Sequence, residues 1–252
     1  MRESRLIPII LLSNNGVYKS INFKNYTYIG DPINTIHLFN DMEVDELIIL
    51  DIDASKNCFV PNYELIKEFS SEAFMPLSYG GGIKTTDQAD KIFKCGVEKI
   101  ILNHSILYNK TIITNFVEKF GSQSIVAAID YKKNIFGKKY CFDYVSNSLT
   151  KINLNEAILE TIEKGVGEIM LTSVDHEGIM KGYDIETISE IINKINIPLI
   201  VSGGAGTIHD FKILNSIGVK GIAAGSFFVY FGKEKGILIN YPSELEIEKY
   251  IS

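Results

Sequence analysis

The feature that most constrains the fold of this chain is a repeat at half its length. A shift of 122 residues places Glu46 on Glu168. The same shift also pairs Asp53 with Asp175, Pro76 with Pro198, Gly81 and Gly82 with Gly203 and Gly204, Asn103 with Gly225, and His104 with Ser226. Several matches in one phase indicate two copies of one structural unit.

Each copy consists of short apolar runs that alternate with helical patterns. Continuous runs rich in Ile and Val are typical of strands that are buried on both faces of a parallel sheet. The predicted strands are 6–12, 46–54, 75–83, 97–103, 124–132, 167–175, 198–206 and 221–228. The predicted helices are 32–42, 61–73, 85–96, 105–120, 154–165, 184–195 and 207–217, and residues 134–147 predict a short hairpin.

Eight strand–helix units predict an α/β fold of the closed (β/α)8 TIM-barrel type. A doubly wound open sheet has the same alternation, but two equal halves favour a barrel with two-fold pseudosymmetry. The length of 252 residues suits one barrel, and no linker-like stretch separates two domains. We therefore expect one domain over 1–252. Residues 231–252 are atypical, because Pro242 and two glycines interrupt any long final helix.

Composition excludes several classes of function. The net charge is −6 and no basic cluster occurs, which argues against nucleic acid as a partner. No run approaches the roughly 18 apolar residues of a membrane span, and the start MRESRLIP lacks the plan of a signal peptide, so we expect a cytoplasmic protein. The three cysteines and four histidines lack the spacing of a metal site or a disulfide framework. We expect no metal and no cofactor.

The repeat also duplicates a pattern typical of phosphate sites. In each half one strand ends in glycines, YGGGI or SGGAG, and the next ends in a small or polar turn, LNHS or AAGS. Glycines let backbone N–H groups approach an anion, and a following helix N-terminus adds its positive dipole end. The pattern predicts two phosphates at opposite rims of the barrel. Glycines that serve only tight turns are the alternative for either half alone.

The first and fifth strands differ where catalytic groups of a barrel belong. If LIPIILL is laid on IVAAIDY by their ends, Leu11 lies opposite Asp130. This match needs a slightly different offset from the rest of the repeat. One half therefore supplies a carboxylate at the expected barrel mouth, and the other supplies a leucine.

Nearly the whole chain resembles the HisF family, the cyclase subunit of imidazole glycerol phosphate synthase. The resemblance is carried by GDPIN, DELIILDIDAS, GGGI, GVEKIILN, FGSQSIVAAID, GEIMLTSVDHEG, KGYD and SGGAG. It implies that ammonia from a HisH-type glutaminase partner enters under the barrel and passes through its core. It also implies two aspartates, at the ends of strands one and five, that act on a bisphosphorylated ribonucleotide.

The resemblance assigns roles to particular residues. The charged ring of the ammonia portal corresponds to Arg5, Glu46, Lys99 and Glu168. A structural layer of salt bridges is the alternative for this ring. Glu98 matches an acidic position that faces the glutaminase, and Asp130 matches the strand-five aspartate. Positions that match phosphate or substrate contacts are Lys19, Asp51, Gly81, Gly82, Asn103, His104, Glu177 (where the family usually has aspartate), Gly178, Ser202, Gly203, Gly204, Gly225 and Ser226.

The strand-one aspartate of the family is replaced by Leu11, which can neither donate nor accept a proton. The loss of a positioned acid or base costs roughly 10²–10⁴-fold in rate. The chain resembles more closely the HisF-like proteins of surface-polysaccharide clusters, through IPIILL, KNIFGKKY, MKGYD and GSFFVYFGKEKGILINYPS. That resemblance implies ammonia supply to an ATP-dependent amidotransferase that makes acetamidino sugars from a phosphorylated or sugar-nucleotide substrate. A genuine cyclase of histidine biosynthesis and a non-catalytic scaffold are the alternatives.

Overall fold

The computed structural model describes residues 4–109, 111–232 and 234–251. Within them, parallel strands form a closed ring in the order β1–β4–β5–β6–β7–β10–β11–β12, and β12 pairs with β1. Their bounds are β1 (Arg5–Ser13), β4 (Leu47–Asp51), β5 (Leu77–Gly80), β6 (Lys99–Leu102), β7 (Ile125–Lys133), β10 (Glu168–Ser173), β11 (Leu199–Ser202) and β12 (Gly221–Ala224). The predicted (β/α)8 barrel is confirmed.

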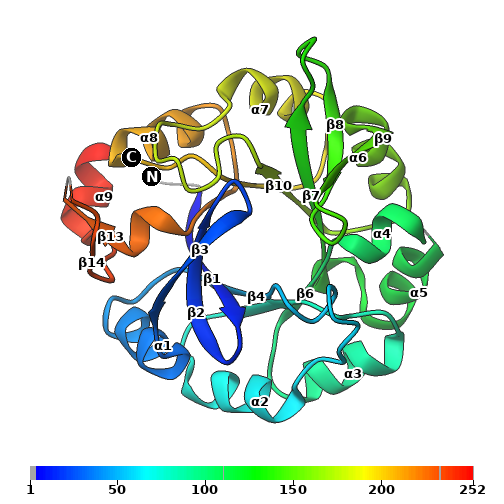
Figure 1. The fold of residues 1–252 in the computed structure, drawn as a ribbon, viewed down its shortest axis with the longest axis horizontal. Helices are drawn as coiled ribbons and strands as arrows, with labels where there is room; N and C mark the ends of the chain where they lie inside the picture. The colour runs from blue at the N-terminus through cyan, green and yellow to red at the C-terminus, as the bar shows by residue number, and fades with distance from the viewer. Residues whose placement is uncertain (1–3, 110, 233, 252) are drawn as a thin grey trace.

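Helices surround the strand ring (Figure 1). They are α1 (Pro32–Asp41), α2 (Tyr63–Glu72), α3 (Thr86–Lys94), α4 (His104–Tyr108), α5 (Thr111–Phe120), α6 (Leu154–Glu163), α7 (Ile185–Ile192), α8 (Ile208–Ser216) and α9 (Glu244–Tyr250). The short 3-10 helices are η1 (Ser122–Ser124) and η2 (Ser226–Phe228). The prediction of one helix over 105–120 was wrong, since α4 ends at Tyr108 before α5 begins.

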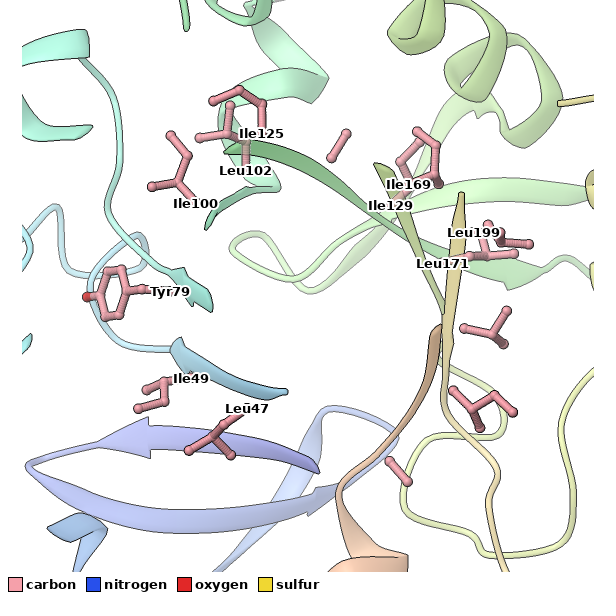
Figure 2. Close-up of a cluster of buried hydrophobic side chains, with 14 of the residues drawn as sticks. Leu47, Ile49, Tyr79, Ile100, Leu102, Ile125, Ile129, Ile169, Leu171 and Leu199 are labelled. Carbon is pink, nitrogen blue, oxygen red and sulfur yellow. The ribbon is translucent and has the colours of Figure 1, made fainter. Parts of the chain in front are cut away.

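Two hydrophobic cores follow from the alternation of side chains along each strand. One core packs strand residues against the helices; it includes Leu47, Ile49, Tyr79, Ile100 and Leu171 (Figure 2). The other fills the barrel interior and is formed by Ile7, Ile9, Ile48, Ile101, Val126, Ala128, Met170, Ile200 and Ala223. The interior is thus a packed apolar layer, as in other barrels of this size.

The half-length repeat is present in the structure. The bounds of α6, β11, α8 and β12 each lie 122 residues beyond those of α1, β5, α3 and β6, as in Pro32–Asp41 and Leu154–Glu163. The helix starts also match: Gln88 accepts the backbone N–H groups of Lys84 and Thr85, and Asp210 accepts those of Gly206 and Thr207.

Each half adds a hairpin after its first strand. β2 (Gly16–Ile21) and β3 (Lys24–Gly30) follow β1, and β8 (Lys139–Asp143) and β9 (Ser148–Asn153) follow β7. The second hairpin confirms the prediction for 134–147, whereas no element was predicted where the first hairpin lies. The run NNG in the sequence could have predicted the first hairpin. Asn14 and Asn15 both adopt positive φ between β1 and β2, as a two-residue hairpin turn requires.

Several predicted strand ends were also placed too late. β4 ends at Asp51 and β5 at Gly80, and the chain then turns. β12 ends at Ala224, and the following residues form η2. After η2 come the short strands β13 (Tyr230–Phe231) and β14 (Gly236–Ile237), and then α9. No helix of the described ranges is both long and apolar enough to cross a membrane.

Candidate functional site

The floor of the barrel, at the amino ends of the strands, carries a ring of alternating charges. Arg5 donates to Glu46 at 2.5 Å and to Glu168 at 2.9 Å. Lys99 lies 3.4 Å from the carboxylate of Glu46 and 3.2 Å from that of Glu168. The structure therefore brings together the four residues of the predicted portal. Two carboxylates and two cations balance each other's charge, which lets them sit beneath an apolar interior.

The two carboxylates of this ring differ in their surroundings. The side chain of Glu46 is 3% exposed and also accepts the hydroxyl of Ser78 at 2.9 Å, whereas that of Glu168 is 12% exposed. Glu98 is exposed and directly precedes Lys99 at this end of β6. An exposed acid beside the ring is available to a partner that covers the floor.

The opposite end of the barrel, the mouth, holds a buried acid on β7. Asp130 accepts the Nδ2 group of Asn103 at 3.0 Å and also bonds the side chain of Thr172. Burial raises the pKa of Asp130 to about 7, although these hydrogen bonds oppose the shift. A carboxyl group with this pKa can gain or lose a proton near neutral pH, which suits acid–base chemistry.

Strand register places Leu11 at the position equivalent to Asp130. Leu11 pairs with Leu50, whereas Asp130 pairs with Thr172, and Leu50 and Thr172 are themselves related by the 122-residue shift. Leu11 and Asp130 line one cavity of about 390 Å³ at the mouth. This cavity therefore has a carboxyl group on one side and an apolar side chain at the pseudosymmetric position.

Lys19, on β2, enters the mouth from the first hairpin. Its side chain is buried and its Nζ donates to the carbonyl of Ile9. Burial lowers the pKa of Lys19 to about 8, and the charge of Glu177 opposes that shift. Gly225 leaves room for the lysine, since a Cβ there would lie 2.6 Å from the Nζ atom. The structure thus places Lys19 and Gly225 next to each other.

The glycine turns have a structural role in both halves. Gly81 and Gly203 adopt φ of 132° and 89°, which favour glycine. A Cβ at Gly81 would lie 2.6 Å from the carbonyl oxygen of Asp51, and one at Gly203 would lie 2.7 Å from that of Ser173. These glycines are needed for tight packing against the preceding strand, whatever they bind.

The predicted contact residues divide between two cavities. The large cavity includes Lys19, Asp51, Gly81, Gly82, Asn103, His104, Glu177, Ser202 and Gly225. A second cavity of about 30 Å³ includes Glu177, Gly178, Ser202, Gly203, Gly204, Gly225 and Ser226. Each cavity contains the glycine turn of one half, and the two share Glu177, Ser202 and Gly225.

Two further predicted contacts, Asp51 and His104, also have partners within the protein. Asp51 accepts the backbone N–H groups of Asp53 and Ala54. His104 Nδ1 lies 2.9 Å from Asp143 on β8, which ties the second hairpin to α4.

Sequence reasoning missed several residues at the mouth. Phe23 and Phe142 bring the two hairpins together, with ring centroids 6.1 Å apart. Lys56 lies over the rings of both Tyr26 and Tyr144, at 5.5 and 5.7 Å. These contacts roof the large cavity. These residues were missed because the contacts join segments that are far apart in the sequence. The only local signal was the NNG turn, which indicates the first hairpin. Among the described residues, no cluster of three or more His, Cys, Asp or Glu side chains suits a metal ion.

Together these features define a barrel of the enzyme type, with a paired-charge floor and a titratable acid in a roofed cavity at the mouth. Residues 5–235 match the family model described as "Histidine biosynthesis protein". The chain belongs to this family and, within it, to the HisF group.

Individual relatives support this assignment. The chain is 44% identical over 251 residues to "Putative imidazole glycerol phosphate synthase subunit hisF3" of Vibrio vulnificus, which covers 99% of this chain and 96% of that protein. It is 45% identical over 243 residues to "Putative imidazole glycerol phosphate synthase subunit hisF2" of Pseudomonas aeruginosa, with 96% and 97% covered. It is 33% identical over 231 residues to "Imidazole glycerol phosphate synthase subunit HisF" of Streptococcus mutans, with 91% and 92% covered. The resemblance to HisF drawn from the sequence is confirmed.

Proposed function

We propose that this chain is the barrel subunit of a glutamine-dependent complex. It receives ammonia at the floor from a HisH-type glutaminase and passes it through the barrel to the mouth. The observation that carries the proposal is the closed ring of Arg5, Glu46, Lys99 and Glu168 beneath an apolar interior. Apolar walls disfavour the charged ammonium ion and so favour the passage of neutral ammonia.

The proposed destination of the ammonia is acetamidino-sugar formation for lipopolysaccharide or another surface glycan. Leu11 supports this choice, because it occupies the strand-one position at which cyclisation in the family requires the second acid. In the proposed route the ammonia passes to an ATP-dependent amidotransferase, which uses it on a sugar nucleotide. The barrel then acts as a conduit, and Asp130 and Lys19 gain or lose protons at its exit.

Glutamine hydrolysis by the cognate glutaminase tests the conduit. We expect hydrolysis to rise when this chain is added, and the rise to be lost or uncoupled in Glu46→Gln and Lys99→Ala. Glu68→Gln, an exposed acid on the outer helix α2, is the matched control and should behave as wild type. A well-formed complex without any rise in hydrolysis would contradict the proposal.

A true cyclase of histidine biosynthesis is the second candidate. It is favoured by Asp130, whose pKa of about 7 suits proton transfer, and by the burial of Lys19 in the same cavity. The test supplies the bisphosphorylated aminoimidazole ribonucleotide with ammonium salt and measures imidazole glycerol phosphate. We expect no turnover by the natural chain. Turnover would favour the cyclase, and Leu11→Asp shows whether the second acid is what the mouth lacks.

A further inference from the structure

The first hairpin lies over the mouth and contacts the opposite side of the barrel. Figure 1 shows β2 and β3 reaching from β1 across the strand ring toward the chain that follows β10. The tip of the hairpin, residues 20–23, meets the loop 174–178 after β10 through several hydrogen bonds. We call β2 and β3 with this tip the lid.

Glu177 makes most of the polar contacts with the lid. Its Oε2 atom accepts the hydroxyl of Ser20 at 3.1 Å and the backbone N–H of Phe23 at 3.2 Å. Its backbone carbonyl accepts the N–H of Asn22 at 3.0 Å. A carboxylate acceptor makes such bonds stronger than neutral ones, and partial burial of both bonds reduces competition from water.

The conformation of the lid tip needs support of this kind. Asn22 and Phe23 adopt positive φ of 53° and 60°, and for a bulky aromatic residue this left-handed conformation is strained. Gly178 allows the lid to approach closely, because a Cβ at this position would lie 2.1 Å from the carbonyl oxygen of Ser20. The backbone of the lid therefore packs directly on residue 178, next to the carboxylate that holds it.

Closure of the lid determines where Lys19 lies. Lys19 directly precedes Ser20, and it is 2% exposed, with its Nζ bonded to the carbonyl of Ile9 inside the mouth. Burial of a lysine ammonium is costly even when it is hydrogen-bonded, so the backbone that carries Lys19 must be held in place from outside the side chain. On the other side of the lid, the ring of Phe23 contacts that of Phe142, and Lys56 lies over the ring of Tyr26. Neither of these contacts is a hydrogen bond to a charged group.

We propose that Glu177 is a positioning residue: it latches the lid onto the loop after β10 and thereby places the Lys19 ammonium in the barrel mouth. Sequence comparison had suggested a substrate contact at this position. The assignment does not depend on which ammonia acceptor the mouth serves. One consequence is that substrate entry requires the latch to open.

Selective acetylation of lysines tests the latch in the full-length chain. Wild type and variants are treated briefly with an N-hydroxysuccinimide acetate, and modification of each lysine is followed by peptide mass spectrometry. We expect Glu177→Leu to raise the modification rate of Lys19 at least about tenfold, the factor expected when hydrogen bonds to a charged group are lost. Glu177→Gln and Ser20→Ala should give smaller increases, because each retains part of the contact.

Two kinds of control separate the latch from general loosening. Lys24 and Lys138 are already exposed and should react at the same rate in every variant. Glu186→Gln removes an exposed acid of the same half that pairs with Lys133 and does not touch the lid, and it should leave Lys19 protected. Unchanged Lys19 protection in Glu177→Leu would overturn the proposal, and so would a rise in every variant including Glu186→Gln. Failure of the glutaminase test with a positive result here would reject the conduit and keep the latch.

Discussion

The two halves of the barrel share a scaffold and differ in chemistry. At the end of β1 the N–H of Asn14 donates to Asp53, and at the end of β7 the N–H of Lys133 donates to Asp175. The N–H of Ile52 bonds the carbonyl of Leu12 just as that of Val174 bonds Tyr131. Repeated backbone bonds of this kind hold both strand ends in the same geometry.

The side chains placed by that geometry are not equivalent. Asp130 has Leu11 as its counterpart, and Asn103 has Gly225. Ser55 and Glu177 are also 122 residues apart; Ser55 bonds Tyr144 of the second hairpin, and Glu177 bonds the lid. Each half thus bonds the hairpin of the other, with a hydroxyl at position 55 in the first half and a carboxylate at the equivalent position 177 in the second. A repeated scaffold can therefore keep its backbone contacts while the side chains at equivalent positions take on different chemical roles.

The largest expected difference between the halves concerns the two glutamates of the floor. Glu46→Ala leaves Arg5 and Lys99 without one partner in a buried ring, which should lower the free energy of unfolding by about 3–5 kcal/mol. Glu168→Ala should cost about half as much, because its side chain is more exposed. Urea unfolding of both variants measures the two losses, and equal losses would remove this asymmetry.

The next prediction concerns pH and the acid that only one half possesses. The pKa of Asp130 is about 7 in the folded protein, against about 3.9 for an unfolded aspartate. The folded state therefore binds more protons than the unfolded state between about pH 4 and 7, so stability falls as pH rises through that window. The loss in the free energy of unfolding across this window is of order 2–4 kcal/mol, at about 1.4 kcal/mol for each unit of pKa difference.

Asp130→Asn should remove this dependence. Relative to wild type, the variant should be more stable at pH 8 than at pH 5, as measured by urea unfolding at both values. Leu11→Asp should introduce a dependence of the same sign in the first half. Parallel pH curves for wild type and Asp130→Asn would show that the carboxyl is already ionised at low pH.

Gly81 and Gly203 test how alike the two scaffolds are. Alanine at either position requires an unfavourable φ and a contact well inside normal separation with a carbonyl oxygen, so each should lower the free energy of unfolding by about 2 kcal/mol. Gly137→Ala is the matched control: its φ is 76° but no atom lies within 4 Å of the added Cβ, so it should cost about 1 kcal/mol. Thermal unfolding measures these losses. A much smaller loss for either Gly81→Ala or Gly203→Ala would show that the two glycine turns are not equivalent.

The smallest expected effects are at the helix starts. Gln88→Ala and Asp210→Ala each remove an acceptor for two backbone N–H groups, which should cost about 1 kcal/mol. Asp210→Ala should cost slightly more, because its carboxylate also interacts with the positive end of α8. Addition of 1 M salt should reduce the loss of unfolding free energy in Asp210→Ala more than that in Gln88→Ala. An equal response to salt would argue against an interaction of the Asp210 charge with the helix dipole.

Much of the fold could be predicted because its signals are local or periodic. Apolar runs, helix-like segments and one half-length shift suffice for a (β/α)8 barrel. The strand ends at Asp51 and Gly80 were placed too late, because residue types alone do not show where the pairing between neighbouring strands stops. The first hairpin was missed because polar residues interrupt both of its strands, and β3 is largely exposed.

At the site, the sequence identified residues, and the structure showed what surrounds them. Pairing by ends already placed Leu11 opposite Asp130, and strand register agrees. The partners of Glu177 could not be predicted, because they lie on a hairpin that crosses the mouth from a segment more than a hundred residues away. The burial of Lys19 depends on the same hairpin.

The sequence by itself determined the repeat, the barrel and the presence of an acid at only one of the two equivalent strand ends, Asp130 and not Leu11. These follow from residue type and order, which tertiary packing does not alter. Only the tertiary structure decided that Asp130 titrates near neutral pH, that Lys19 is buried, and that Glu177 faces the lid. A pKa and a buried contact depend on what surrounds a group in space, and here the surroundings come from both halves of the chain.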